Sequence, residues 1–147
     1  MPSFLYDEFV TSIMGSASAS GFFPDLQDNS YRIFLIDHGV DVPNQATDQT
    51  VNDRAVGAQV PALASAPTLG SQSVVIDANQ GKFDAADTVF AGLSGVECES
   101  IDLFNYINDT PTNDLLIANF NDYTGLPITP SGGNLVVIWP ATGIIRI

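Results

Sequence analysis

The sequence predicts a mainly β protein: an antiparallel β-sandwich or small barrel with one amphipathic helix at its N-terminus. Its acidic side chains are fourteen Asp and only three Glu, and aspartate favours turns and caps over helix interiors. Lys and Arg, which fill exposed helix surfaces, number only four. About six apolar runs are separated by stretches rich in Asn, Asp, Gly and Pro, which is typical of antiparallel strands.

The length and composition indicate one globular domain. The chain has 147 residues, of which 45% are hydrophobic, so it can bury a single core without disulfides or metals. It contains no internal repeat and no linker that would divide it. We therefore expect a single domain over residues 1–147.

Residues 3–14 (SFLYDEFVTSIM) form the one segment with helical periodicity. Leu5, Phe9 and Ile13 recur at four-residue spacing, which predicts an amphipathic helix. The following GSASASG stretch, residues 15–21, predicts a flexible joint. Two interpretations stay open: the helix packs on the domain's own sheet, or it docks on a neighbouring subunit.

We assign residues 31–147 to the β-sandwich. YRIFLID (31–37) is apolar at nearly every position, which indicates a strand covered on both faces. Residues 38–72 predict a long loop, and loops of this length in a compact domain often make contacts. Further strands are expected at 73–78, 82–92, 96–108, 114–120 and in a final hairpin from 134 onward.

The last segment, residues 134–147 (NLVVIWPATGIIRI), is the most hydrophobic in the sequence. We expect its final strand to lie in the core or against a neighbouring copy, because an uncovered apolar edge would promote aggregation. Arg146, its only charged residue, should point away from the isoleucines, toward solvent or an acidic neighbour.

The charge excludes several classes of partner. With a net charge of −13 and four basic residues, the chain cannot neutralise a phosphate backbone or bind an anionic membrane surface. No apolar run reaches transmembrane length, and the first 14 residues are too short and too acidic for a signal peptide. We expect synthesis in a cytoplasm.

The sequence predicts no catalytic, cofactor-binding or metal-binding residues. The only imidazole, His38, lies in a predicted turn, and the only cysteine, Cys98, stands between Glu97 and Glu99, where a thiolate is disfavoured. Lys82, the only lysine, also lies in a predicted turn. No hydrolase elbow, phosphate-binding loop or zinc-protease motif is present.

Two kinds of chemistry need only carboxylates and stay open on the sequence alone. A glycosidase requires two acids at a fixed separation, and the seventeen acids offer many pairs. DANQGKFDAAD (77–87) contains oxygen ligands but fails the EF-hand spacing, so Asp84 and Asp87 are interpreted as turn residues. Calcium binding by an acidic loop is not decided.

A surface carbohydrate-binding or host-binding module is a further alternative. Such a module needs aromatic side chains exposed on loops, and the candidates are Phe22, Phe23 and Tyr123. Trp139, the one tryptophan, falls in a strand that is expected to be in the core.

The motif S-F-L-Y-D-E-F at residues 3–9, followed by Y-R-I-F-L-I-D at 31–37, resembles the opening of small structural proteins of tailed bacteriophages. K-F-D-A-A-D (82–87), L-L-I-A-N-F (115–120) and the closing G-G-N-L-V-V-I-W-P-A-T-G-I-I-R-I are similar to the same proteins. The resemblance covers most of the chain and carries no catalytic residues.

This resemblance implies a non-enzymatic virion component, with capsid decoration (cement) proteins first and neck, tail or fibre components second. The implied partners are the major capsid protein, other virion proteins and further copies of the chain in a homo-oligomer, without nucleic acid or membrane. The 38–72 loop and the N-terminal helix are the expected contact elements. An acidic protein suits the outer surface of a particle, because packaged DNA would repel it from the lumen.

Overall fold

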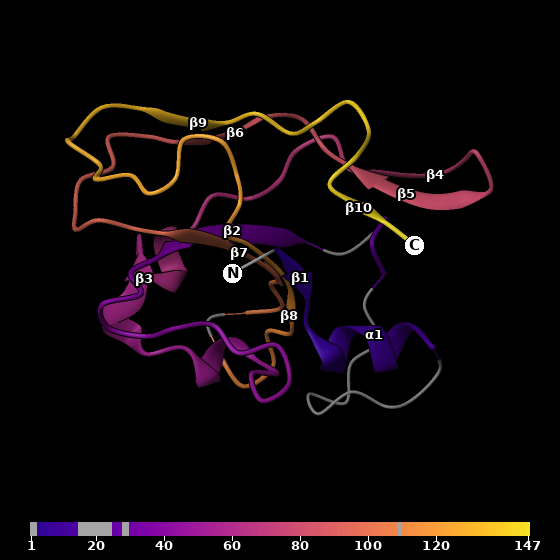
Figure 1. Cartoon of the computed structure of the whole chain (residues 1–147), viewed down its shortest axis with the longest axis horizontal. Helices are drawn as coiled ribbons and strands as arrows, with labels where there is room; N and C mark the ends of the chain where they lie inside the picture. The colour runs from indigo at the N-terminus through magenta and orange to yellow at the C-terminus, as the bar shows by residue number, and fades with distance from the viewer. Residues whose placement is uncertain (1–2, 15–24, 28–29, 109) are drawn as a thin grey trace.

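A computed structural model describes residues 3–14, 25–27, 30–108 and 110–147. The predicted joint at 15–21 and the candidate aromatics Phe22 and Phe23 lie outside the described residues. The described chain is mainly β, with antiparallel sheets and one helix near the N-terminus, which confirms the predicted fold class (Figure 1). Its strands form open sheets and no closed barrel in these parts of the chain.

The centre of the molecule is a five-stranded antiparallel sheet. Its strands, in spatial order, are β1 (Phe4–Leu5), β8 (Leu116–Phe120), β7 (Ser100–Asn105), β2 (Tyr31–Ile36) and β3 (Gln59–Val60). β7 is buried along its whole length, and β2 is buried at every position except the half-buried Arg32. The burial of β2 on both faces agrees with its continuous apolar sequence.

Two small sheets lie over one face of the central sheet (Figure 1). Their strands are β4 (Ser73–Asp77), β5 (Gln80–Asp84) and β10 (Ile145–Arg146) in one sheet, and β6 (Thr88–Phe90) and β9 (Leu135–Val137) in the other. The larger hydrophobic core fills the space between the layers. It joins Ile33 and Leu103 of the central sheet to Phe83, Phe90 and Ile145 of the small sheets.

The segment predicted as a long loop, 38–72, covers the opposite face of the central sheet. It contains β3 and three 3₁₀ helices: η1 (Val51–Asp53), η2 (Val56–Ala58) and η3 (Leu63–Ser65). Val51, Ala58 and Ala66 are buried in a second core with Phe34 and Phe104 of the sheet. Much of this segment is therefore a structural layer within the chain.

The helix is shorter than the predicted 3–14, because α1 spans Asp7–Ile13. Phe4 and Leu5 instead form β1 and pair with β8, which supplies their backbone hydrogen bonds. Phe9 is fully buried in the larger core, whereas Ile13, at the far end of the helix, is 37% exposed. Phe9 thus anchors the helix on the domain's own sheet.

The C-terminal strand is also held within the chain. β10 pairs with β5, and Ile144 and Ile145 are buried, but Ile147 remains 55% exposed. Arg146 is exposed and forms an ion pair with Asp77 of β4. The acidic neighbour expected for Arg146 lies in its own subunit.

Candidate functional site

His38 is held beside a serine that no substrate can reach. Its Nε2 lies 2.8 Å from Ser100 Oγ, and its backbone N–H donates to the Glu99 carboxylate. Ser100 is fully buried, and its hydroxyl also accepts a hydrogen bond from Asn119 Nδ2 at 3.0 Å. A serine nucleophile must contact its substrate, so the geometry favours a structural contact between the start of β7 and the turn after β2.

The other two candidate nucleophiles are also engaged within the chain. Burial, reinforced by the carboxylates of Asp37 and Glu99, raises the pKa of the Cys98 thiol to about 12. Cys98 is thus a protonated core residue at neutral pH. The Lys82 ammonium lies 3.2 Å from the Asp84 carboxylate and donates to the carbonyl oxygen of Ala141.

The acids of the possible calcium loop have protein partners. Asp84 pairs with Lys82, and the Asp87 carboxylate accepts the backbone N–H of Trp139 at 3.0 Å. Within the described ranges, no three metal-ligating side chains come together as a cluster. The loop geometry therefore gives no support to a metal site in this part of the chain.

A buried polar network joins the 38–72 layer to the central sheet. Arg54 Nε donates to Asp102 Oδ2 at 2.8 Å, and Arg54 also contacts Asp41 and Asp48 of its own segment. Both oxygens of Asp102 are used, because Oδ1 accepts the Tyr6 hydroxyl at 2.7 Å and an amide N–H of Asn119 at 2.8 Å. Arg54 and Asp102 are inaccessible to solvent.

The electrostatics of this network favour a fixed ion pair. Burial raises the pKa of Asp102, and the Arg54 guanidinium opposes that rise. Burial lowers the pKa of Arg54, but the charge of Asp102, the nearby Tyr6 and the hydrogen bonds to both side chains together raise it by more. Burial and Asp102 together raise the pKa of Tyr6. The network joins Tyr6, the 38–72 segment, β7 and β8, and the burial of Arg54 and Asp102 argues for a structural role.

Sequence reasoning did not predict this network. Arg54 stands in an Asp-rich segment and Asp102 in an apolar strand, 48 residues apart, so their pairing depends on the fold. The available signal was a single Asp flanked by Ile101 and Leu103, because a carboxylate inside a buried strand requires a partner.

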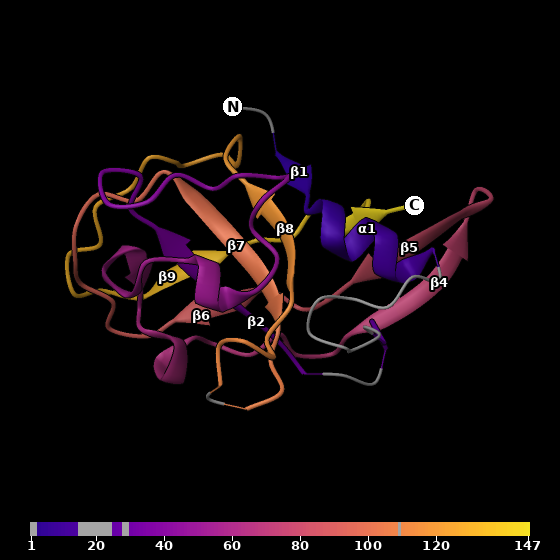
Figure 2. The ribbon, with the colours of Figure 1, turned by 90° about the horizontal axis from the view of Figure 1, so that it is seen from below.

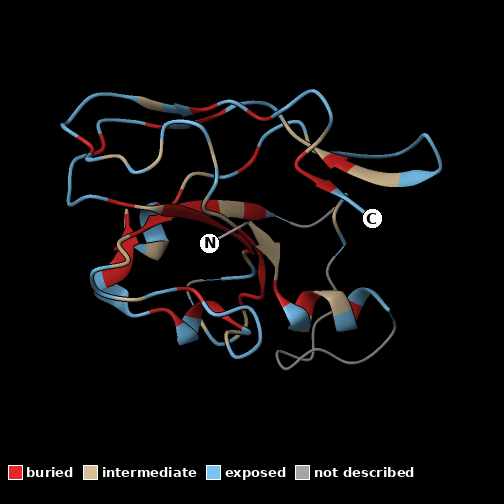
Figure 3. Cartoon of the chain, in the orientation of Figure 1, coloured by how far each residue is buried: buried red, intermediate tan, exposed pale blue. Residues whose placement is uncertain are grey.

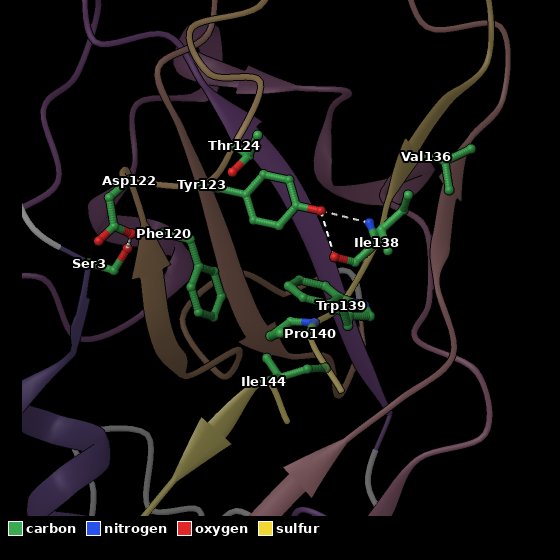
Figure 4. Close-up of a pocket in the computed structure, with 10 residues that line it drawn as sticks. All are labelled: Ser3, Phe120, Asp122, Tyr123, Thr124, Val136, Ile138, Trp139, Pro140 and Ile144. Carbon is green, nitrogen blue, oxygen red and sulfur yellow. Dashed lines mark hydrogen bonds between the residues drawn. The ribbon is translucent and has the colours of Figure 1, made fainter. Parts of the chain in front are cut away.

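An aromatic groove of about 580 Å³ lies on the described surface (Figure 4). Its lining combines aromatic rings with a few polar groups and aliphatic side chains. The residues are Ser3, Phe120, Asp122, Tyr123, Thr124, Val136, Ile138, Trp139, Pro140 and Ile144. The groove thus lies between the end of β8 and the segment that follows β9.

The polar atoms of the two larger rings are occupied within the chain. The Tyr123 hydroxyl accepts the backbone N–H of Ile138 and donates to its carbonyl oxygen, both at 2.7 Å (Figure 4). Trp139 Nε1 donates to Thr88 Oγ1 at 3.1 Å. The ring surfaces can offer only apolar contact, while the exposed Asp122 carboxylate, hydrogen-bonded to Ser3, supplies the polar edge. Such a lining suits a ligand with one apolar face.

The second feature open to partners is the hairpin of β4 and β5, here called the β4–β5 arm. It projects beyond the central sheet (Figures 1 and 2). All five residues of β4 are exposed, including Val74, Val75 and Ile76. Ala78 and Asn79 form its two-residue loop with φ values of 50° and 65°, as a type I′ turn requires.

No protein-family model matches this chain, and it has no significant sequence similarity to any curated protein compared with it. No functional residue can therefore be transferred from a relative. A helix with the length and apolar character to cross a bilayer is also absent from the described residues.

Proposed function

We propose that this chain is a non-enzymatic structural protein of a bacteriophage particle, an outer capsid decoration (cement) protein that stabilises the shell through subunit contacts. The observation that carries the proposal is the β4–β5 arm, because β4 exposes Val74, Val75 and Ile76 on a strand whose outer edge has no partner strand in the described part of the chain. An apolar strand edge is an aggregation hazard unless a partner covers it. A protein that works by binding neighbouring subunits has such a partner.

The charge of the chain supports the same proposal. At −13, the protein is repelled by packaged DNA, and this charge keeps particles apart when it faces outward. An apolar strand on an acidic body limits contact to partners that fit the strand. The motif resemblance to phage structural proteins supports the virion as the location.

Mass spectrometry of purified particles from a phage that encodes this chain tests the proposal. We expect the chain at a copy number comparable to that of the major capsid protein. A copy number far below that of the capsid subunit would replace decoration by a neck, tail or fibre role. Absence from the particles would overturn the proposal as a whole.

Particle binding also tests the role of the arm. Ile76→Asp should reduce co-sedimentation with undecorated capsids, because it places a charge on the exposed apolar strand. Val96→Asp is the matched control, since Val96 is an exposed valine outside the arm, the N-terminal helix and the 38–72 segment. Equal binding by both variants would remove the arm from the proposed contact.

A second candidate function is carbohydrate or host-surface binding at the aromatic groove. The specific observation is that the partly exposed Tyr123 ring and the edge of the largely buried Trp139 line the groove beside the Asp122 carboxylate, which suits the apolar face and hydroxyl edge of a neutral sugar. Tyr123→Ala is a poor test, because the Tyr123 hydroxyl anchors Ile138.

A better test uses the only tryptophan as the reporter. Glycans selected on an array should change Trp139 fluorescence, and Asp122→Ala should weaken the effect while Glu97→Gln, on an exposed residue outside the groove, should not. A fluorescence response that Asp122→Ala leaves unchanged, or no array binding at all, would rule out this candidate.

A further inference from the structure

The outer edge of β4 has no partner strand among the described residues. In its sheet, the order is β10, β5, β4, so β5 pairs with one edge of β4 and leaves the other open. The strand reads SVVID, with three exposed apolar side chains between Ser73 and Asp77. A strand that can add to this edge would satisfy its backbone groups and cover its side chains.

The hydrogen bonds on the other side of β5 show which backbone groups of β4 point outward. Gly81 exchanges both of its backbone hydrogen bonds with Ile147, at 2.8 and 3.0 Å, so it directs them away from β4. Ile76, which faces Gly81, therefore directs its own N–H and C=O outward. Since the directions alternate along an antiparallel strand, Val74 also points outward and Val75 points toward β5.

This pattern restricts how two copies of β4 can pair. In an antiparallel ladder, a residue whose backbone groups point outward must lie opposite another such residue. Val74 and Ile76 of one copy must therefore each lie opposite Val74 or Ile76 of the other copy. When Val74 faces Ile76 of the copy, Val75 faces its own symmetry mate, and every apolar residue meets an apolar residue. A shift of two residues in one direction places Asp77 opposite Val75, and a shift in the other places Val75 opposite Ser73. The arrangement centred on Val75 is the one that pairs the whole apolar strand.

The charges also permit this arrangement. Asp77 faces Ser73 of the copy, so no two carboxylates lie opposite each other, which would be destabilising. In addition, Asp77 is already paired with Arg146 of its own chain. The edge is therefore compatible with self-association even though each copy carries a charge of −13.

We infer that the partner of the β4–β5 arm is a second copy of this chain, joined through an antiparallel β4–β4 ladder with a two-fold axis at Val75. A two-fold contact presents the same patch on both copies, and β4 fits itself in this way. The inference rests on the proposed function, because it names the partner of the arm that carries that proposal. The β4–β4 pairing joins the three-stranded sheets of the two copies into one continuous sheet.

Sedimentation of the isolated protein tests the pairing. The wild type should show a concentration-dependent dimer, and Val75→Lys should weaken it by roughly tenfold or more, because it removes the central apolar contact and places two lysines opposite each other. Val56→Lys makes the same charge change at an exposed site outside the arm and should leave the dimer intact. A wild type that stays monomeric at all concentrations overturns the inference, as does an equal loss in both variants.

Cysteine crosslinking tests the register. A Val75→Cys variant should form a symmetric disulfide under mild oxidation, because directly opposed residues of a non-hydrogen-bonded pair lie about 4.5 Å apart at Cα, within disulfide range. Ile76→Cys should crosslink far less, since it faces Val74 of the copy. The native Cys98 is buried and does not compete. Equal crosslinking at both positions would overturn the Val75 axis.

These measurements separate the inference from the proposed function. A Val75-centred dimer of a chain that is missing from purified particles would leave the inference standing and overturn the virion role. A chain that is present in particles but is monomeric in isolation, without the Val75 crosslink, would support the virion role and overturn the inferred dimer.

Discussion

Strands β7 (SIDLFN) and β4 (SVVID) have similar compositions and opposite environments. Both begin with serine, carry several large apolar residues and include one aspartate. All six residues of β7 are buried, whereas all five residues of β4 are exposed (Figure 3). β7 lies between β2 and β8 with a layer on each face, and β4 lies at the edge of a small sheet. An apolar sequence pattern therefore indicates that the side chains of a strand require burial. It does not determine whether the same chain or a partner buries them.

The aspartates of these two strands extend the comparison. Asp102 of β7 is inaccessible to solvent and is bonded by Arg54, Tyr6 and Asn119. Asp77 of β4 is half-exposed, and its partner is Arg146. An exposed ion pair contributes little to stability, while a buried pair becomes very costly when one partner is lost. Asp102 is therefore part of the buried structure that the fold requires, whereas Asp77 is a surface residue of the β4–β5 arm.

The largest expected effect follows from deleting residues 144–147. The deletion removes the buried Ile144 and Ile145, and each buried isoleucine contributes roughly 1.5–3 kcal/mol, so we expect a loss of about 3–6 kcal/mol. Urea denaturation would measure it. A truncated protein of unchanged stability would contradict this expectation, because it would show that β10 and its pairing with β5 contribute nothing to the stability of the fold.

Arg54→Met should destabilise the protein by about 3–5 kcal/mol, because it leaves the Asp102 carboxylate buried without its cation. Arg146→Met is the matched control, since it breaks the exposed ion pair with Asp77 and should cost about 0–1 kcal/mol. Both values come from denaturant titrations of the same protein. Similar costs for the two variants would contradict the contrast between the two aspartates.

The sequence predicted the elements of this molecule better than their partners. The strand at 31–37 was recognised because its apolar run is continuous, and the fold class followed from strand spacing and turn chemistry. The start of the helix was wrong, because Phe4 and Leu5 pair with Ala118 and Asn119, which are distant in sequence. Local periodicity carries no information on such a pairing.

The same limit applies to the candidate sites. Cys98 and His38 were interpreted as structural from their neighbours in sequence, and the buried thiol and the buried Ser100 beside His38 agree with that interpretation. The aromatic groove joins residues 120–124 to 136–144, and its shape depends on how these segments meet. Tyr123 was recognised as a candidate, and Trp139 was correctly assigned to the core, where it is 7% exposed and also lines the groove.

The pH dependence of the free energy of unfolding tests the burial of the Cys98 thiol, which lies just before β7. Since the pKa of the Cys98 thiol is raised from 9.0 to about 12, the folded state retains a proton that the unfolded state loses. Its contribution to stability is present below pH 9 and is lost as the pH rises toward 12. We expect Cys98→Ala to reduce this decline in denaturation experiments between pH 9 and 11. A decline of the same size in the variant would assign it to other groups.

The smallest expected effect on stability comes from a substitution on β4 itself. Ile76 is 78% exposed, so Ile76→Ala should change the free energy of unfolding of the monomer by no more than about 0.5 kcal/mol. Leu103→Ala makes a similar truncation in β7, where the side chain is fully buried, and should cost about 2–5 kcal/mol. Both measurements belong at low protein concentration, where dimers dissociate. At higher concentration, Ile76→Ala should become destabilising, because the side chain then faces Val74 of the copy and binding stabilises the folded state by mass action. A cost at Ile76 that is large at every concentration would show that the arm is covered by its own chain, and β4 would then differ from β7 only in degree.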